Sequence, residues 1–476
     1  MWKVSFTLLI LLNSFIGGLL FWQWDAYSQV LDSTNSEQVE KVKQKVTVTS
    51  KGNQLHITQL FTGLNSDKEY RIMAPEKVQE WGCVKSDGNP CESVDDNPSS
   101  YLADANSLTI NYLIDMKENN SPFLLNHWLV YLPDVETTHT SIEVIDTSRR
   151  KGSWVAGLPL KGHNKFELID YYVFEGLGDN SSLYWQPTPL KRVYGEQGIQ
   201  YYSAANTDKN SLLFNSLHRI PNFKGLSIVV SDVYPETNGV SLMIVHPNIT
   251  NEVIERKIIY NYLMNKTDNL PLEERWLIDV LTSIITGQDS NVPKGQEFIK
   301  ELKGNLTEDE LLTFTNMVIN ETLLTAQKLD NLLGNLAGKS THFFTLNKNE
   351  ETMIVPLYYF DPRRIMIQDK LQENFEVLIM SNNDRYYPFT ETMNALGFNV
   401  KVLVDNETVL LNKEDNSYRF YVNQNIFIYN EEDYGLLENP LTYINGKVYI
   451  ESSWLETIFK VDFQETKEEI KVTIDY

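Results

Sequence analysis

Two cysteines are the residues whose type and spacing indicate a chemistry most directly. Cys83 and Cys91 are the only cysteines of the chain, and the segment between them contains Ser-Asp-Gly-Asn-Pro, a run of turn formers that can fold its ends together. In an oxidising compartment we expect them to form a disulfide, which would close a short loop and stabilise it by about 2 kcal/mol. The alternative is two free thiols, because the spacing excludes a Cys-x-x-Cys metal or redox site.

Other catalytic and metal-binding patterns are scarce. The seven histidines are scattered, with no His-x-His or His-x-x-x-His pair, and there is no Gly-x-Ser-x-Gly elbow or phosphate-binding loop. We therefore expect no cofactor and no nucleophilic catalysis. Residues 361–364, Asp-Pro-Arg-Arg, are a basic point in an acidic chain, and they predict either an ordinary solvated turn or a contact with an anionic polymer.

The composition limits the classes of partner. The chain has 476 residues, too many for one hydrophobic core, so roughly two to four domains are expected. Its 41 Lys and Arg residues against 64 Asp and Glu residues give a net charge of −23. This excess of carboxylates repels phosphate backbones and anionic lipid surfaces, so nucleic acid is not an expected partner.

An apolar run from Val4 to Trp22 dominates the N-terminus. It is long enough to cross about 30 Å of hydrocarbon, and Lys3 before it and Asp25 after it favour a cytoplasmic N-terminus. We therefore predict a single-pass anchor in the cell membrane, with the bulk of the chain extracytoplasmic. A cleaved signal peptide is the alternative, and it would export the remainder in the same way.

Alternating apolar and polar residues predict strands in the first half of the chain, at 46–49, 55–58, 108–112, 127–131 and 141–145. Clusters of Gly, Asn, Asp and Pro separate these runs, as is typical of an all-β sandwich. Helical periodicity extends from residue 252 to about residue 337, and strands with short helical patterns return from about residue 353.

The fold class predicted from these patterns is a multidomain α+β protein. Its expected parts are a membrane anchor or uncleaved signal at 1–24, a tether at 25–44, a β-sandwich at 45–208, an α-rich domain at 209–350 and a small α+β module at 351–476.

Two similar segments form a near-repeat in the C-terminal module. Residues 385–400 and 445–461 each run from a strand end through a short helix into a new strand. Their motif residues are Tyr387, Pro388, Leu396 and Gly397 in the first copy, and Asn445 and Gly446 in the second. The pattern resembles the domain named after the N-terminal domain of copper amine oxidases, common as a stalk on Gram-positive surface proteins. The resemblance implies spacing or binding in the cell wall and no copper site, since no histidine lies in the region.

The middle of the chain resembles zinc aminopeptidases of the gluzincin type, in which a β-sandwich precedes a thermolysin-like catalytic domain. That family has two strands, a helix with His-Glu-x-x-His, and then a Glu within Trp-Leu-x-Glu-Gly. Here apolar strands at 226–230 and 242–245 precede a helix at 252–265, and Trp-Leu-Ile-Asp-Val at 276–280 matches the last motif. The correspondence places Arg256, Lys257 and Tyr260 over His-Glu-x-x-His and Asp279 over the ligand Glu.

The residues at these positions do not suit zinc catalysis, which needs two imidazoles one helical turn apart, a carboxylate ligand and a Glu base. Arg256 and Tyr260 have no imidazole, and Lys257 replaces the base with a cation. Positive charges beside a dication are strongly unfavourable in a low-dielectric pocket, so we expect no zinc there and predict a salt bridge between Asp279 and Arg256. Ser241 or Leu242 takes the place of the acidic residue at the family's substrate edge.

Together, these features predict a non-catalytic pseudo-peptidase of the cell envelope. Its expected contacts are the membrane, through the N-terminal helix, and a peptide, a cell-wall polymer or another membrane protein, with the former substrate cleft as a docking surface. The alternatives are an active zinc aminopeptidase or other surface hydrolase with an unrecognised site, and a purely structural spacer.

Overall fold

The computed structural model describes residues 39–474, apart from gaps at 67, 79, 117–119, 197, 205–213, 215, 222, 224, 268–269, 381–382 and 404–406. The chain divides into two compact units: residues 214–221 belong with the part from residue 250 onward, and the rest of the preceding chain forms the other unit. The predicted membrane anchor and most of the tether lie outside the described residues. Within the part that is described, no helix has the length and apolar character needed to span a membrane.

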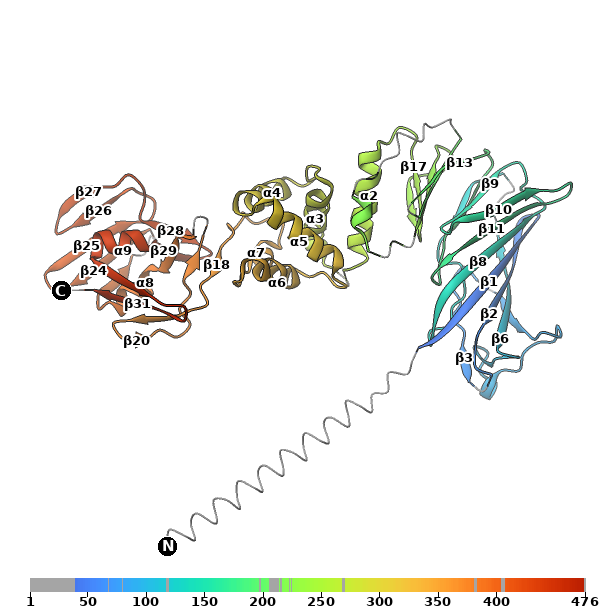
Figure 1. The fold of residues 1–476 in the computed structure, drawn as a ribbon, viewed down its shortest axis with the longest axis horizontal. Coiled ribbons are helices and arrows are strands. Elements are labelled where there is room, and N and C mark those ends of the chain that lie inside the picture. The colour runs from blue at the N-terminus through green and yellow to red at the C-terminus, as the bar shows by residue number, and fades with distance from the viewer. Residues whose placement is uncertain are drawn as a thin grey trace, which may run out of the picture. The chain divides into compact units, whose positions relative to one another are not determined.

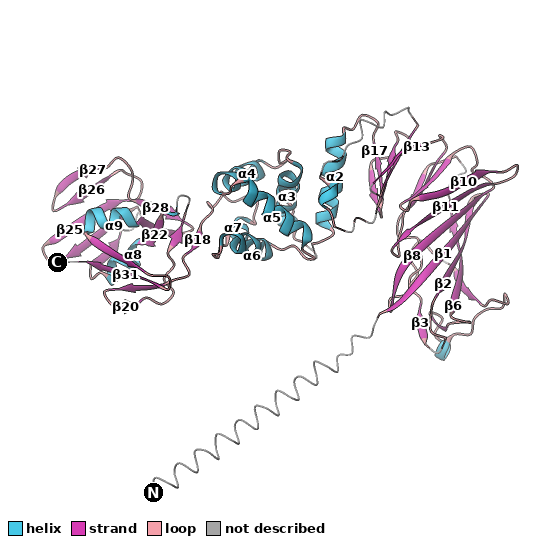
Figure 2. Cartoon of the chain, viewed as in Figure 1, coloured by secondary structure: helices cyan, strands magenta, loops and turns pink. Residues whose placement is uncertain are grey.

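A seven-stranded sheet dominates the first unit (Figures 1 and 2). Its order is β10-β11-β8-β1-β2-β6-β4, and every pair is antiparallel except β1 with β8. The strands are β1 Glu40–Lys51, β2 Gln54–Thr62, β4 Trp81–Val84, β6 Ser107–Asp115, β8 Val135–Asp146, β10 Leu160–Lys165 and β11 Asp170–Leu177. Alternate residues of β1, including Val42, Val46 and Val48, are buried, as period-two patterning requires. Strand β1 begins within the range expected as tether, because the alternation already starts at Val42.

A three-stranded sheet, β7-β12-β9, contributes to the same core. Its strands are β7 Phe123–Leu125, β9 Ser153–Ala156 and β12 Leu183–Gln186, and β3 Glu69–Arg71 pairs separately with β5 Ser100–Leu102. The shared core contains Trp128, Trp154 and Trp185, each almost fully buried. The predicted sandwich is thus confirmed at the level of β-sandwich-like sheets.

The strand predicted at 127–131 is wrong. His127 has a left-handed φ of 49°, which breaks a ladder at that point, and the regular strand is instead β7, just before it. Trp128 is buried with its Nε1 donating to the Ser181 carbonyl at 2.8 Å, and the Val130 amide donates to Gln59 Oε1 at 3.1 Å. Tyr131 forms an isolated antiparallel bridge with Met73, and Trp128, Leu129 and Val130 are all buried, so the alternation in the sequence does not mark a regular strand.

A mixed five-stranded sheet completes the first unit, in the order β13-β14-β15-β17-β16. Its strands are β13 Lys191–Glu196, β14 Ile199–Ser203, β15 Leu226–Val230, β16 Thr237–Gly239 and β17 Leu242–Val245. The three central strands run parallel and the outer two are antiparallel to their neighbours. All residues of β14 and β17 are buried. Burial of both faces explains why β17 appears in the sequence as a continuous apolar run, whereas β14 also buries the polar Gln200 and Ser203.

The second unit begins with six helices: α2 Asn251–Met264, α3 Trp276–Thr286, α4 Pro293–Asn305, α5 Glu308–Asn320, α6 Ala326–Ala337 and α7 Phe343–Asn347. Phe298, Phe314, Phe343 and Phe344 are almost fully buried and pack against one another. The buried Asp330 of α6 accepts hydrogen bonds from the amides of Phe344 and Thr345, which caps α7. The helical periodicity expected for this region is confirmed.

An earlier segment of the chain docks on these helices. Within residues 214–221, the Ser216 amide donates to the buried carboxylate of Glu255 on α2. Arg219 Nη2 donates to Thr315 Oγ1 of α5 at 2.5 Å, and its Nη1 lies 3.4 Å from the Ile285 carbonyl of α3. The segment therefore ties three helices together, although it precedes β15 in the sequence.

The C-terminal module contains three further sheets, β18-β21-β22-β29-β28, β20-β19-β31-β30 and β23-β24-β25-β26-β27 (Figure 1). Its elements are β18 Tyr359–Phe360, β19 Arg364–Ile367, β20 Lys370–Leu371, β21 Leu378–Ile379, β22 Arg385–Pro388, α8 Phe389–Ala395, β23 Asn399–Val402, β24 Thr408–Lys413, β25 Asn416–Tyr421, β26 Ile426–Tyr429, β27 Glu432–Gly435, β28 Leu441–Ile444, β29 Lys447–Glu451, α9 Ser452–Phe459, β30 Val461–Glu465 and β31 Glu469–Ile474. The predicted near-repeat is confirmed, since β22-α8-β23 and β29-α9-β30 have the same order.

Candidate functional site

The matched positions of the former zinc motif lie on two neighbouring helices. Arg256 is on α2 and Asp279 is on α3, and only 11% of each side chain is exposed. Arg256 Nη2 lies 2.5 Å from Asp279 Oδ1, so the expected salt bridge is present. The same guanidinium donates to Ser283 Oγ at 2.9 Å and to the Asp289 carbonyl at 3.0 Å.

Three further donors share the Asp279 carboxylate. Ser290 Oγ donates to Oδ2 at 2.6 Å, the Asn291 amide donates to Oδ2 at 3.0 Å, and Asn291 Nδ2 donates to Oδ1 at 3.2 Å. With Arg256 included, each carboxylate oxygen accepts two hydrogen bonds, which uses the capacity of the group. Asp279 therefore holds the loop after α3 against α2 and α3. The sequence correspondence missed Ser290 and Asn291, because neither belongs to a periodic pattern.

The other two matched residues occupy the same part of α2. Helical spacing places Tyr260 one turn after Arg256 and on the same face of α2. Lys257 directly follows Arg256 in the sequence. Both side chains are partly exposed. Among the described residues, no hydrogen bond joins Tyr260 to Arg256 or Asp279. The structure thus brings Arg256 and Asp279 into contact and leaves Tyr260 outside their network.

Trp276, the first residue of the matched Trp-Leu-x-Glu motif, holds a different loop. Its Nε1 donates to the Lys348 carbonyl at 2.8 Å, and the ammonium of Lys294 lies 5.1 Å from its ring centroid. Lys294 is buried and donates to the carbonyls of Asn347 and Asn349, at 3.1 and 2.5 Å. Burial lowers the pKa of Lys294. Trp276 and Lys294 therefore fix the chain that follows α7.

The strand edge that corresponds to the family's substrate edge belongs to the first unit. Ser241 has a left-handed φ of 55°, and Leu242 is fully buried in β17. The Val240 amide donates to Ser182 Oγ at 2.7 Å, and the Ser182 amide donates to the Val240 carbonyl at 3.0 Å. The edge is therefore attached by paired hydrogen bonds to Ser182, the residue just before β12, and neither Ser241 nor Leu242 offers a carboxylate.

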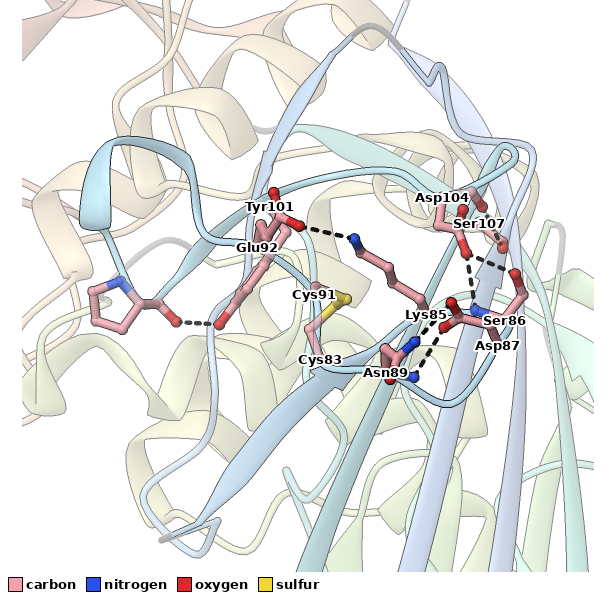
Figure 3. The surroundings of a disulfide bond; sticks show 11 residues. Cys83, Lys85, Ser86, Asp87, Asn89, Cys91, Glu92, Tyr101, Asp104 and Ser107 are labelled. Carbon is pink, nitrogen blue, oxygen red and sulfur yellow. Dashed lines mark hydrogen bonds and ion pairs between the residues drawn. A yellow bond between two sulfur atoms is a disulfide. The ribbon is translucent and has the colours of Figure 1, made fainter.

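Figure 3 shows the predicted disulfide between Cys83 and Cys91. Cys83 lies on the edge strand β4, and the Cys91 amide donates to the Cys83 carbonyl at 3.0 Å. The Lys85 amide donates to the Asn89 carbonyl at 2.7 Å, which closes the turn. Ser86 donates through Oγ to Asp104 at 2.8 Å. The disulfide prediction is confirmed, and the bond crosslinks the two sides of a hairpin at the edge of the large sheet.

A cluster of four charges lies in the C-terminal module, and the Asp361 side chain at its centre is buried. Arg363 donates to Asp361 through Nε at 2.8 Å and Nη2 at 2.6 Å, and through Nη1 to Glu465 at 2.9 Å. Arg385 joins Asp361 at 3.2 Å and Glu465 at 2.8 Å. Burial alone raises the pKa of Asp361, but the hydrogen bonds and charge of Arg363, together with the hydrogen bond from Arg385, outweigh burial and lower that pKa below its ordinary value.

This cluster revises the expectation for residues 361–364. Arg363 is part of the cluster, with 14% of its side chain exposed, whereas Arg364 is 63% exposed. The sequence identified the basic point but not its partners, because Arg385 and Glu465 lie far along the chain.

The motif residues of the C-terminal module are structural. Tyr387 and Leu396 are buried, and Pro388 pairs with Tyr449 across β22 and β29. Gly397, after α8, has a φ of 88°. Asn445 and Gly446 form the turn between β28 and β29 with φ angles of 44° and 85°, a combination that Asn-Gly turns favour.

The described residues contain no group of three or more His, Cys, Asp or Glu side chains arranged to hold a metal ion. Asp279 is the only acidic residue among the four matched positions. The donor set that the structure assembles there is a guanidinium, hydroxyls and amides around one carboxylate, which suits an ion pair and does not suit zinc.

Comparison with known families identifies the C-terminal module. Residues 366–474 match the copper amine oxidase N-terminal domain family. The resemblance predicted from the near-repeat is thus confirmed for that part of the chain. No curated protein matches this sequence.

Several solved structures of zinc peptidases are similar to the chain. An M1 zinc metallopeptidase from Deinococcus radiodurans is 10% identical with a TM-score of 0.40, over 63% of this chain and 90% of that one. Aminopeptidase A from Legionella pneumophila in complex with aspartic acid is 9% identical with a TM-score of 0.43, over 81% of this chain and 52% of that one. Leukotriene A4 hydrolase from Saccharomyces cerevisiae is 11% identical with a TM-score of 0.32, over 51% and 47%. The predicted family is thus found among the similar structures, but at these values the similarity assigns no residue role and no activity.

Proposed function

We propose that this chain is a non-catalytic protein of the cell envelope, in which an aminopeptidase-like scaffold serves binding. The observation that carries the proposal is the Asp279 network. The one acidic residue at a matched ligand position is paired with Arg256 and accepts three more hydrogen bonds from Ser290 and Asn291.

Electrostatics oppose metal binding at these positions. A divalent ion would have to displace the Arg256 guanidinium from Asp279. Because only 11% of the Arg256 side chain is exposed, the displaced guanidinium would stay close to the ion. Repulsion between a dication and a guanidinium is strong where water is scarce. Lys257, at the position of the general base, is a cation at neutral pH and cannot accept a proton from water.

The envelope part of the proposal rests on three features. The apolar run from Val4 to Trp22 suits a membrane anchor, a disulfide suits an oxidising compartment, and the C-terminal module resembles domains common on Gram-positive surfaces. The strongly acidic composition argues against nucleic acid. We propose a peptide, a cell-wall polymer or another membrane protein as the partner.

Metal analysis of the purified full chain tests the proposal. After dialysis against zinc, we expect much less than one zinc per chain and no release of amino acids from peptide substrates with or without a chelator. An Asp279→Ala variant serves as the control, because any zinc bound at the matched site would be lost from it. Stoichiometric zinc that disappears in Asp279→Ala, together with chelator-sensitive peptide cleavage, would establish the opposite function, an active aminopeptidase.

A further inference from the structure

The hairpin between β10 and β11 ends in two exposed apolar side chains. Phe166 is 54% exposed and Leu168 is 76% exposed, and they flank Glu167 at the tip. Loops normally expose polar residues, and large apolar side chains at a projecting tip are unfavourable in water unless something covers them. The exposure of Phe166 and Leu168 therefore indicates a binding role for this tip, separate from the aminopeptidase-like scaffold.

The tip is held in one conformation. Arg150 donates through Nη2 to the Phe166 carbonyl at 2.7 Å and through Nη1 to the Glu167 carbonyl at 2.8 Å. Its Nε donates to the buried carboxylate of Asp170 at 3.1 Å, and the Phe166 amide donates to the Ile169 carbonyl at 2.8 Å. These four bonds fix the backbone that carries both apolar side chains. A preformed tip loses little conformational entropy when it binds.

Basic residues surround the tip at one end of the large sheet. Strand register places Asp170 opposite Asp146, and the Thr147 amide donates to the Ser50 carbonyl, so three turns meet at this end. Those turns carry the exposed or partly exposed side chains of Lys51, Arg150, Lys151 and Lys165. The acids beside them are Glu167 at the tip and the buried Asp170, which pairs with Arg150 at 3.1 Å and with Lys165 at 3.7 Å. The four cations outnumber these two carboxylates, and the buried Asp146 is offset by the buried Arg149, so the local charge is positive on a chain whose net charge is −23. Because charges more than about 8 Å away are largely screened at physiological ionic strength, the local charge decides what the tip attracts.

We propose that this tip docks on an anionic lipid surface, with Phe166 and Leu168 inserted between headgroups and the surrounding lysines against the phosphates. Apolar side chains within a basic collar are the combination that interfacial membrane binding requires. A protein partner fits less well, since a stable interface buries about 800 Å² on each side and a convex tip with two apolar side chains offers little of that. The inference goes beyond the proposed function and does not depend on the N-terminal run.

A fluorophore at the tip tests the proposal in the full chain. The native cysteines form a disulfide, so Glu167→Cys supplies a single reactive thiol for an environment-sensitive label between the two apolar residues. With vesicles of phosphatidylcholine and phosphatidylserine, we expect a blue shift of the label and its quenching by spin-labelled lipid. With phosphatidylcholine alone, the response should be much weaker. The N-terminal run is present in every sample, so the label reports on the tip itself.

Matched variants identify the residues responsible. Phe166→Ser with Leu168→Ser is expected to abolish the shift, whereas Leu177→Ser, at the other end of β11 and 65% exposed, should leave it unchanged. Lys151→Gln and Lys165→Gln should each weaken vesicle binding of the tip by about fivefold, the effect of about 1 kcal/mol per basic residue. A label that stays in water with every vesicle, a shift that survives the double serine variant, or a shift produced only by added envelope protein would each overturn the proposal.

Discussion

At the scale of single residues, the ion pair between Asp279 and Arg256 is expected to stabilise the folded chain, although Asp279 occupies the position of a zinc ligand in the resembled family. Arg256→Met is expected to lower the free energy of unfolding by about 3 kcal/mol, because it leaves a buried carboxylate without its counter-charge. Arg275→Met, at an exposed position just before α3, is the control and should change stability by no more than about 0.5 kcal/mol. Urea unfolding of both variants measures the difference. If Arg256→Met behaves like Arg275→Met, the ion pair contributes nothing and the network is held by Ser290 and Asn291.

Removing both charges provides a second comparison at the same site. Arg256→Met with Asp279→Leu is expected to be more stable than Arg256→Met alone, because no unpaired charge remains. A double variant that is less stable than the single variant would mean that Asp279 stabilises the loop after α3 independently of Arg256.

The Asp361 carboxylate makes stability depend on pH. Its pKa in the folded chain is lowered, so its contribution is complete above the ordinary value of 3.8 and is lost as the pH falls through the folded value. At neutral pH we expect Asp361→Asn to cost about 3 kcal/mol, since Arg363 and Arg385 lose their shared partner. The difference between the two proteins in urea unfolding should shrink as the pH is lowered towards about 3. A difference that stays constant with pH would show that the effect of the substitution is not one of charge.

At the scale of elements, the disulfide hairpin is expected to be a local device. Replacing both cysteines by serine removes a short-loop crosslink worth about 2 kcal/mol. The backbone bonds between Cys91 and Cys83 and between Lys85 and Asn89 remain, so β4 should stay paired with β6. Hydrogen exchange is expected to speed up at residues 84–90 and to remain unchanged in the C-terminal module. Faster exchange throughout β2 and β6 would show that the crosslink supports the whole sheet.

Local patterns predicted most elements, because period-two and helical periodicities depend on burial of one face. The strands around Val46 and Ile57 and the helix from Asn251 follow that rule. The strand predicted at 127–131 is wrong for a local reason as well. The left-handed φ of His127 interrupts the strand, and the alternation of apolar and polar residues does not reveal it.

The contacts that define the sites were less predictable, because they join distant parts of the chain. Arg256 and Asp279 were paired through their positions in a resembled motif, but Ser290 and Asn291 carry no periodic signal. Glu465 lies 102 residues from Arg363, and no sequence spacing indicates that contact. Exposure of Phe166 and Leu168 at a hairpin tip likewise needed the strand register.

At the scale of the whole molecule, the chain combines a strongly negative net charge with one basic, apolar tip and an apolar N-terminal run. The excess of acidic residues repels phosphate-rich polymers, so the membrane contacts that we propose are limited to these two segments. The two proposed contacts would act by different means, since a run that spans a bilayer is held permanently, whereas a tip with two apolar side chains binds reversibly.

The N-terminal run leads to a prediction for the intact cell. Arg substitutions at Leu11 and Leu12 should each cost about 3 kcal/mol at the centre of a spanning helix, so the double variant is expected to leave the membrane fraction. Leu177→Arg, at an exposed site of β11, is the matched control and should remain with the unaltered protein after alkaline extraction. Protease added outside intact cells is expected to digest the part from residue 39 onward.

The intact mass of the purified protein separates the two forms of export. An anchored chain keeps Met1, whereas a chain freed by signal cleavage lacks the apolar run and leaves the membrane after alkaline extraction. Two results together would contradict both the anchored and the cleaved form of export. The whole chain would be protected from external protease, and the double arginine variant would still be found in the membrane fraction. In that case the disulfide between Cys83 and Cys91 would have to form in a reducing compartment, where such bonds are rare.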